Sequence, residues 1–246
     1  MLGYDLAMSK YIDAHCHILS ADQMSAAAAC GVGRFIINAT EQSNWQSVID
    51  LANQNNVYGA IGVHPWYVND LSDGWNIQLV ELLSANPNLM VGEIGLDNNH
   101  PKLDVQEIVF RRHLQIAHDL GRVGHVHVVG AWGKMMDVLG GAKLPPAMVL
   151  HCFSGAPELV PCLNNAGAYF SFGSGILDER HKTMRAAVAC VPENRILVES
   201  DAPDVAMPDT IPDTVAEIAK IRGVACEYMA DIIYNNTMGL LNGKSA

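Results

Sequence analysis

The sequence predicts an α/β protein folded as a single (β/α)8 TIM barrel. Short apolar stretches alternate with amphipathic stretches, and this alternation repeats about eight times along the chain. Buried parallel strands form short apolar runs, and strands that alternate with helices pair in parallel through right-handed crossovers. A barrel of this kind commonly uses about 250 residues. An open doubly wound sheet is the alternative, because periodicity does not show closure.

We expect one domain over residues 1–246, because neither a linker nor a low-complexity segment divides the chain. Met8 is a second candidate start, so residues 1–7 are expected to be a dispensable extension.

Eight stretches are continuously apolar and short enough to be buried strands. They are residues 11–17, 34–38, 57–63, 89–93, 123–127, 148–151, 168–172 and 196–200.

The clearest helical pattern covers residues 104–120. Apolar residues such as Val105, Ile108 and Val109 recur there at helical spacing, and Gly121 is a typical C-terminal stop. The other predicted helices are residues 43–55, 74–86, 132–139, 157–166, 178–189, 213–221 and 226–240.

Composition and charge exclude several classes of protein. Half of the residues are hydrophobic and 17% are charged, which excludes a disordered chain. Six cysteines without a C-x-x-C pair predict neither a disulfide scaffold nor a thiolate zinc knuckle, and they favour a reducing, cytoplasmic compartment. No signal peptide and no membrane span are expected. The net charge of −11 argues against a broad nucleic-acid-coating surface, although a small basic patch stays compatible with it.

Ionisable residues follow the apolar stretches at the points where the predicted strands end. The carboxyl ends of barrel strands converge on one face, where active sites lie. We therefore expect one pocket to contain His15, His17, His64, Glu93, His127, His151 and Asp201.

His15 and His17 are two residues apart on the first strand, so their side chains point to the same face. Imidazole and carboxylate are good ligands for zinc, manganese, iron or nickel. A lone strand histidine is usually an ordinary core or surface residue. Several polar groups buried together without partners would cost several kcal/mol each, so a shared metal is the better interpretation. We interpret His125 as a packing residue that faces the helices.

At these residues the chain resembles the TatD family of metal-dependent hydrolases. The landmarks are DAHCH at 13–17, GVHP at 62–65, GEIGLD at 92–97, LHCFSG at 150–155 and ESDAP at 199–203. The resemblance covers nearly the whole chain. The substrate-side loops differ from the family pattern, because Asp204 replaces a frequent aromatic residue and NNHP follows GLD.

The resemblance implies a barrel that holds one to three divalent ions, and we expect two per chain. It implies that one ion binds to His15, His17, Glu93 and Asp201. It implies that a second binds to Glu93, His127 and His151, with Glu93 as the bridge. Zinc, manganese and magnesium are the candidate metals.

The expected chemistry is hydrolysis by a metal-activated water. Asp201 is the predicted proton acceptor, and with Glu93 it forms the predicted catalytic pair. Asp13 is predicted to orient a ligand histidine or the strand start. From the resemblance, His64 is expected to contact the substrate.

The resemblance points to DNA, cut from a 3′ end, as the substrate. Trp66 and Trp132 are candidates to stack on a base, with packing between loops as an equal alternative, and Lys134 is a candidate to contact a phosphate. The alternative substrate is a small amide, lactone or ester. A positive rim around the pocket would favour the nuclease, and a closed neutral pocket would favour the small molecule. A non-catalytic metal-binding protein is a remote alternative. We expect a monomer.

Overall fold

The structure is a computed structural model that describes residues 9–17 and 20–243. The predicted extension at residues 1–7 lies outside the described residues.

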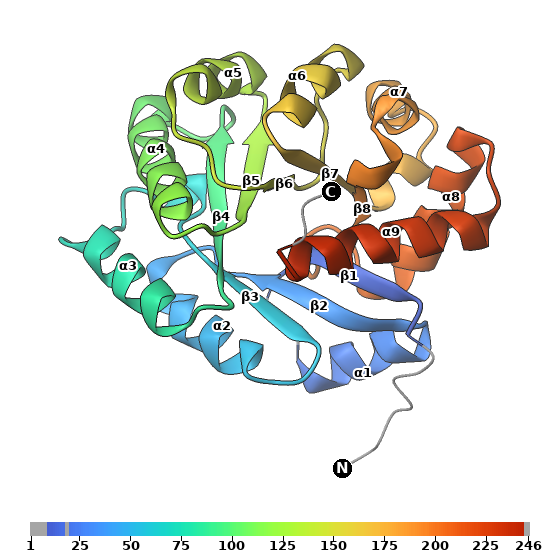
Figure 1. Cartoon of the computed structure of the whole chain (residues 1–246), viewed down its shortest axis with the longest axis horizontal. Coiled ribbons are helices and arrows are strands. Elements are labelled where there is room, and N and C mark those ends of the chain that lie inside the picture. Colours follow the sequence, from blue (N-terminus) through green and yellow to red (C-terminus); the bar gives the residue numbers. More distant parts are fainter. Residues whose placement is uncertain (1–8, 18–19, 244–246) are drawn as a thin grey trace.

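Eight parallel strands follow one another around a ring in the order in which they occur in the sequence (Figure 1). They are β1 (Tyr11–Cys16), β2 (Val32–Asn38), β3 (Val57–Ile61), β4 (Met90–Asp97), β5 (Gly124–Val129), β6 (Met148–Leu150), β7 (Ala168–Phe172) and β8 (Ile196–Val198). All eight predicted strands are present.

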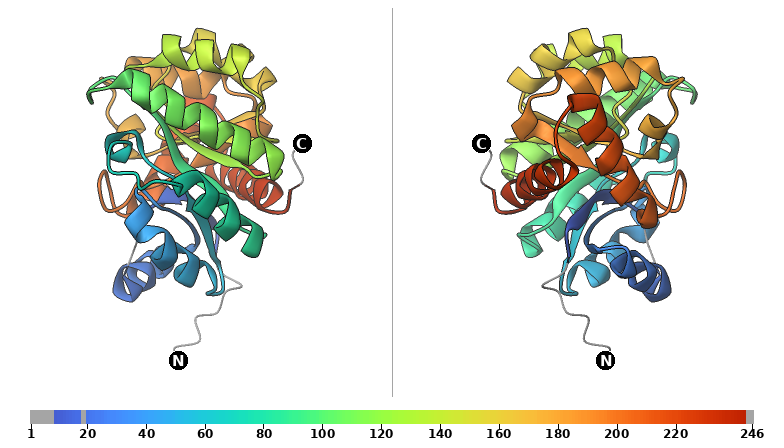
Figure 2. Two further views of the ribbon diagram at one scale, coloured as in Figure 1. Left: turned by 90° about the vertical axis from the view of Figure 1, so that its left-hand side faces the viewer. Right: turned by 90° about the vertical axis from the view of Figure 1, so that its right-hand side faces the viewer.

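Helices cover the outside of the ring, as both side views show (Figure 2). The α-helices are α1 (Ala21–Ala29), α2 (Trp45–Ala52), α3 (Trp75–Ala85), α4 (Leu103–Asp119), α5 (Trp132–Gly141), α6 (Val160–Asn165), α7 (Lys182–Cys190), α8 (Ile211–Arg222) and α9 (Cys226–Leu241). Short 3-10 turns lie in the connections: η2 (Gln42–Asn44), η3 (Pro65–Tyr67), η4 (Pro157–Leu159), η5 (Ser174–Leu177), η6 (Glu193–Arg195) and η7 (Pro208–Thr210).

Backbone hydrogen bonds between the two ends of the chain close the ring. The amide of Asp201, just after β8, donates to the carbonyl of His15 over 3.0 Å. The amide of His17 donates to the carbonyl of Ala202 over 2.8 Å. The predicted (β/α)8 barrel is therefore confirmed, and the open doubly wound sheet is excluded.

Helix α1 was not expected from the sequence. Its residues, ADQMSAAAA, have good helix propensity but little apolar contrast, and only Ala27 is buried. The signal that predicts its start is a capping box, in which the Ser20 side chain and the Gln23 side chain each bond to the other's backbone amide.

Two apolar layers hold the barrel together. One lies between the strands and the surrounding helices, and Trp45, Phe110 and Phe153 are among its largest side chains. The other fills the inside of the ring with residues from the strands, such as Ile36 and Tyr169. This inner layer leaves the carboxyl ends of the strands free for polar side chains. In the described part of the chain, no helix is both long and apolar enough to cross a membrane.

Candidate metal centre

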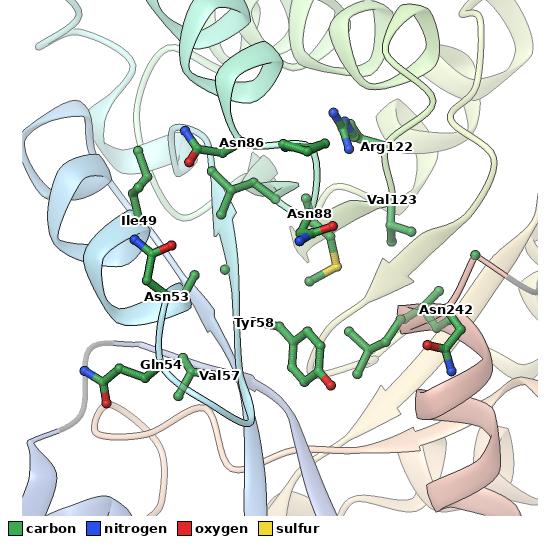
Figure 3. Close-up of a pocket in the computed structure, with 18 of the residues that line it drawn as sticks. Ile49, Asn53, Gln54, Val57, Tyr58, Asn86, Asn88, Arg122, Val123 and Asn242 are labelled. Carbon is green, nitrogen blue, oxygen red and sulfur yellow. The ribbon is translucent and has the colours of Figure 1, made fainter.

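A cavity of about 600 Å³ opens at the carboxyl ends of the strands. The predicted site residues that line it are His17, His64, Trp66, Glu93, His127, His151 and Asp201. A larger hollow, about 700 Å³, lies at the opposite end of the barrel (Figure 3). Neither a histidine nor a carboxylate occurs among the described residues that line that hollow, so the two ends differ sharply in chemistry.

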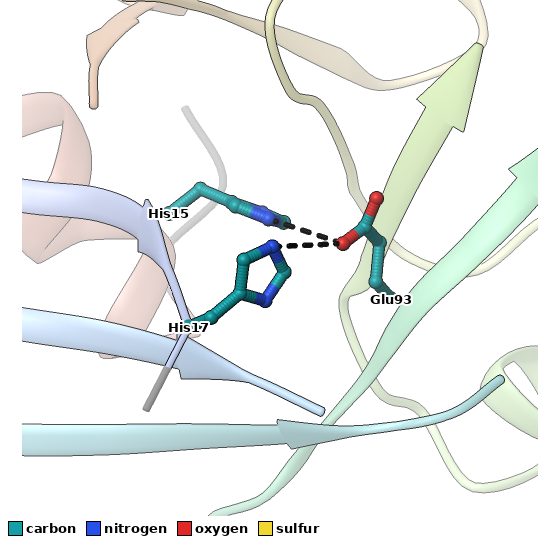
Figure 4. Close-up of side chains that lie close together, drawn as sticks. All are labelled: His15, His17 and Glu93. Carbon is teal, nitrogen blue, oxygen red and sulfur yellow. Dashed lines mark ion pairs between the residues drawn. The ribbon is translucent and has the colours of Figure 1, made fainter. Parts of the chain in front are cut away.

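Glu93 lies at the centre of the cluster, and its two carboxylate oxygens face different partners. On one side, Oε2 is 3.4 Å from His15 Nε2 and 3.6 Å from His17 Nε2. Figure 4 marks these two ion pairs with dashed lines. The carboxylate of Asp201 completes this group, because its Oδ1 is 3.7 Å from His15 Nε2 and 3.4 Å from His17 Nε2.

The other oxygen of Glu93 faces three different imidazoles. Oε1 is 2.8 Å from His151 Nε2, 3.0 Å from His127 Nδ1 and 3.4 Å from His64 Nε2. His127 Nδ1 and His151 Nε2 are themselves 3.0 Å apart. One carboxylate therefore lies between two separate groups of nitrogen and oxygen donors.

Glycines in β4 allow this close arrangement. A Cβ on Gly95, whose φ is +148°, would lie 1.9 Å from the carbonyl oxygen of His127. A Cβ on Gly92 would lie 2.6 Å from the Cβ of His125. The GEIG segment thus lets β4 pass tightly beside β5 while Glu93 points into the site.

Carboxylates that the sequence analysis did not single out support two of these histidines from behind. Asp97 Oδ2 is 3.4 Å from His127 Nε2 and also accepts a 2.6 Å bond from Trp66 Nε1. Glu199 Oε1 is 3.7 Å from His151 Nδ1. A partner of this kind fixes the orientation and tautomer of a metal-ligating imidazole. Asp97 ends the buried strand β4 and Glu199 directly follows the buried strand β8, within the quoted GEIGLD and ESDAP segments, which was the available signal.

Two other hydrogen bonds fix imidazole tautomers. His17 Nδ1 lies 3.1 Å from the carbonyl of Asn38 and must donate to it, so Nε2 is free to accept an ion. His64 Nδ1 accepts from the amide of Trp66 over 3.2 Å, so neutral His64 carries its proton on Nε2.

Asp13 holds the backbone together at the joint between β1 and β8. Its Oδ1 accepts from the amides of Ser200 and His15, and its Oδ2 accepts from the Ser200 hydroxyl. Burial raises the pKa of Asp13 to about 7, although the bonds from Ser200 oppose this shift. Asp13 thus joins β1 to the segment after β8, and its role in orienting a ligand histidine or the strand start stays a prediction.

Burial and the attraction between histidines and carboxylates shift the pKa values of the site in opposite directions. Burial alone would lower the pKa of His17, but the contact with Asp201 Oδ1, 3.4 Å from its Nε2, and the charge of Glu93 raise it to about 9. Burial raises the pKa of Glu93, but the surrounding histidines outweigh this and hold it well below its usual range. Burial lowers the pKa of His64 to about 3. Glu93 is therefore an anion that attracts cations from both sides.

The donor set fits divalent metal ions. His15 Nε2, Glu93 Oε2 and Asp201 Oδ1 are buried and have no hydrogen-bond partner. Donor atoms of His15, His17 and Glu93 lie within 4.8 Å of one another. Those of Glu93, His127 and His151 lie 2.8 to 3.0 Å apart. Buried polar atoms without partners are costly, and an ion shared between them removes that cost. Imidazole and carboxylate together suit zinc or manganese.

The interpretation of His125 as a helix-facing residue was wrong. His125 and His127 are two apart on β5, so both point to the inside of the barrel. The His125 ring is fully buried and lies 5.8 Å from the His15 ring, without a hydrogen-bond partner for either nitrogen.

The structure places the remaining predicted contacts at different distances from the cavity. Trp66 lies at its rim, 48% exposed, with its ring stacked on His100. Trp132 packs edge-on against Phe153 and does not line the cavity. Lys134 does not line it either, because its Nζ forms a 2.9 Å ion pair with Glu107 of α4. A substrate contact of Lys134 stays a prediction.

The protein family described as "TatD related DNase" matches residues 12–242. The chain belongs to the TatD family. A relative from Escherichia coli described as "Uncharacterized metal-dependent hydrolase YjjV" is 30% identical and covers 95% of this chain and 98% of its own. The crystal structure of YjjV superposes with a TM-score of 0.90 at 28% identity, over 96% of this chain and 99% of YjjV. The chain is thus a metal-dependent hydrolase of the TatD family.

Another TatD-family relative carries a more specific name. The Escherichia coli protein "3'-5' ssDNA/RNA exonuclease TatD" is 30% identical over 197 residues, which are 78% of this chain and 75% of that protein.

Proposed function

We propose that this protein is a two-metal phosphodiesterase that removes nucleotides from the 3′ end of single-stranded DNA. The observation that carries the proposal is the position of Glu93 between two donor groups, one on each carboxylate oxygen. Paired ions about 3.5–4 Å apart are typical of enzymes that displace one oxygen at phosphorus by another. The name of the TatD exonuclease supports this choice of substrate.

In this proposal His15, His17, Glu93 and Asp201 hold one ion, and Glu93, His127 and His151 hold the other. The bound ions would lower the pKa of a water molecule and neutralise charge on the phosphate. Asp201 lines the cavity, and the surrounding histidines keep its pKa below the usual range against the effect of burial. It is therefore an anion that can accept the water's proton and return one to the leaving oxygen.

His64 has a different role from that of the ligands. It is neutral at ordinary pH, because burial lowers its pKa to about 3, and its Nε2 carries the proton. Nε2 lies in the cavity beside Glu93 and can donate a hydrogen bond to a phosphate oxygen.

Trp66 supplies a surface on which the terminal base can stack. Its ring lies at the rim of the cavity, backed by His100 at a centroid distance of 5.6 Å. Stacking on an aromatic ring tolerates any base, because every base has a π-face.

One observation favours the second candidate function, hydrolysis of a small ester, lactone or amide. Among the described residues that line the cavity there is neither a lysine nor an arginine. The described lining therefore lacks a positive rim. A small uncharged substrate would be repelled less than DNA by the carboxylates of the cavity.

The test is to incubate the protein with 3′-labelled single-stranded DNA and Mn²⁺ or Mg²⁺, beside a Glu93→Gln variant. Shortening of the strand by the wild type alone supports the nuclease. If neither protein cuts while metal analysis finds bound ions in the wild type, the nuclease proposal is wrong. A panel of small esters, lactones and amides then tests the second candidate with the same pair of proteins.

We further propose a cytoplasmic location, in keeping with cysteine usage. All six cysteines, the pocket residue Cys152 among them, are free thiols. Free thiols are typical of reducing compartments. Fractionation of cells that express the tagged protein tests this, and recovery in an exported fraction would contradict it.

A further inference from the structure

Asp204 places a third carboxylate at the mouth of the metal cavity. Its Oδ2 is 3.8 Å from His17 Nε2, and its side chain is 72% exposed. The turn after β8 holds it there, because the amides of Asp204 and Val205 both donate to the carbonyl of Asp201 over 3.0 Å. The position of Asp204 is thus tied to that of a predicted metal ligand.

In the described part of the chain Asp204 is paired with neither a lysine nor an arginine, and the cavity around it is lined by neither. Its one ion-pair contact there is with His17, whose imidazole must be neutral to hold an ion. Three basic side chains from other segments are already paired with carboxylates: Lys134 with Glu107, Arg180 with Asp178 and Arg185 with Glu217. The charge of Asp204 therefore acts on whatever enters the cavity.

Glu93 and Asp201 differ from Asp204 in what they do. They are buried, so the proposed ions would neutralise them, whereas Asp204 is exposed at the entrance. A polyanionic strand bound at the metals would have to place its next phosphate near this entrance. Two like charges within about 8 Å of each other still repel through solvent, because the Debye length at physiological ionic strength is about 8 Å.

We propose that Asp204 is a specificity-determining residue that selects short substrates with a single phosphate over polyanionic strands. The proposal rests on the proposed phosphodiesterase function and narrows its substrate from single strands of any length to the shortest ones, such as a dinucleotide. The preferred substrate carries one phosphodiester at the metals and an uncharged or hydrogen-bond-donating group toward Asp204. A hydrogen-bond donor at this position can bond to the carboxylate of Asp204, whereas a second phosphate there would be repelled by it.

The test compares a dinucleotide, which has one phosphodiester, with a longer single strand. The metal-loaded wild type, Asp204→Asn and Asp209→Asn are assayed on both. Asp209 lies in η7, is exposed and does not line the cavity, so it controls for the change in net charge. We expect Asp204→Asn to raise kcat/KM on the long strand about threefold to sevenfold relative to the dinucleotide. High salt should reduce this difference, and Asp209→Asn should match the wild type.

Two results would overturn the proposal. One is an equal effect of Asp204→Asn on both substrates. The other is a large loss of turnover on both, which would make Asp204 part of the catalytic machinery.

A binding measurement separates this inference from the proposed function. If no variant cuts either substrate, the function fails, and the affinity of each metal-loaded protein for the dinucleotide and for the longer strand is measured by calorimetry. We expect Asp204→Asn to bind the longer strand about threefold to sevenfold more tightly than the wild type and Asp209→Asn do, and to bind the dinucleotide equally well. The same change for both ligands, no change for the longer strand, or no binding by any of the three proteins would overturn the role of Asp204.

Discussion

The backbone amide of Asp201 donates a 3.0 Å hydrogen bond to the carbonyl oxygen of His15. Asp201 follows the last strand of the barrel, and His15 lies in the first strand. His15 Nε2 is 3.4 Å from Glu93 Oε2 and 3.7 Å from Asp201 Oδ1. The bond that closes the ring therefore also sets the distance between two predicted metal ligands. The same contact therefore closes the barrel and brings His15 and Asp201 together in the site.

Replacing Asp201 by asparagine tests its role as the proton acceptor. We expect Asp201→Asn to lower kcat at least about 100-fold, because an amide cannot take a proton from water. The shape of the side chain is kept, so the variant should still unfold in one cooperative transition. Turnover and thermal unfolding are measured on the same preparation. A rate equal to that of the wild type would show that Asp201 is not the base.

Replacing Asp97 by asparagine tests the support behind His127. Asp97 lies 3.4 Å from His127 Nε2, and loss of such a partner typically weakens metal binding about 10- to 100-fold. We expect calorimetry with Mn²⁺ to show weakening of one of two binding events, because His15 and His17 do not contact Asp97. Asp178→Asn, whose carboxylate pairs with Arg180 instead, serves as the control. Equal weakening of both events would contradict the separation into two donor groups.

Two substitutions of Trp66 separate stacking from hydrogen bonding. Trp66→Ala removes the ring at the rim and should raise KM for single-stranded DNA about 5- to 100-fold, because base stacking contributes about 1–3 kcal/mol. Trp66→Phe keeps an aromatic surface and loses only the 2.6 Å bond to Asp97, so most of the affinity should remain. If phenylalanine is as harmful as alanine, the tryptophan acts through Asp97 rather than through stacking.

Metal binding should become tighter as the pH rises toward about 9. The pKa of His17 is raised from 6.5 to about 9 in the ion-free protein, so its stabilising charge is complete below pH 6.5 and is lost through pH 9. An ion must displace that same proton, and its apparent affinity therefore increases over this range. Calorimetry with Mn²⁺ at several pH values measures it, with His17→Ala as the comparison. An affinity that does not change with pH would contradict this explanation.

The position of the site followed from the sequence, because parallel strands bring their carboxyl ends together. The structure does bring His15, His17, Glu93, His127, His151 and Asp201 into contact distance at that end. Their role as ligands stays a prediction until an ion is measured.

Other features of the site and fold could not be predicted, because they depend on three-dimensional contacts that the pattern of residue types does not contain. Glu199 and Asp97 resemble ordinary polar residues until the fold places them behind ligand histidines. Lys134 follows a strand closely, yet Glu107 on the neighbouring helix holds it away from the cavity. Helix α1 has too little apolar contrast to be visible by periodicity, and its capping box was the better signal.

The most direct test of the account is electron paramagnetic resonance of the Mn²⁺-loaded protein. Two manganese ions that share the carboxylate of Glu93 are magnetically coupled, and we predict that coupled signal at two ions per chain. In Glu93→Gln the coupling should disappear and the bound metal should fall below two ions. Two uncoupled ions in the wild type, or an unchanged coupled signal in Glu93→Gln, would contradict the bridging role of Glu93.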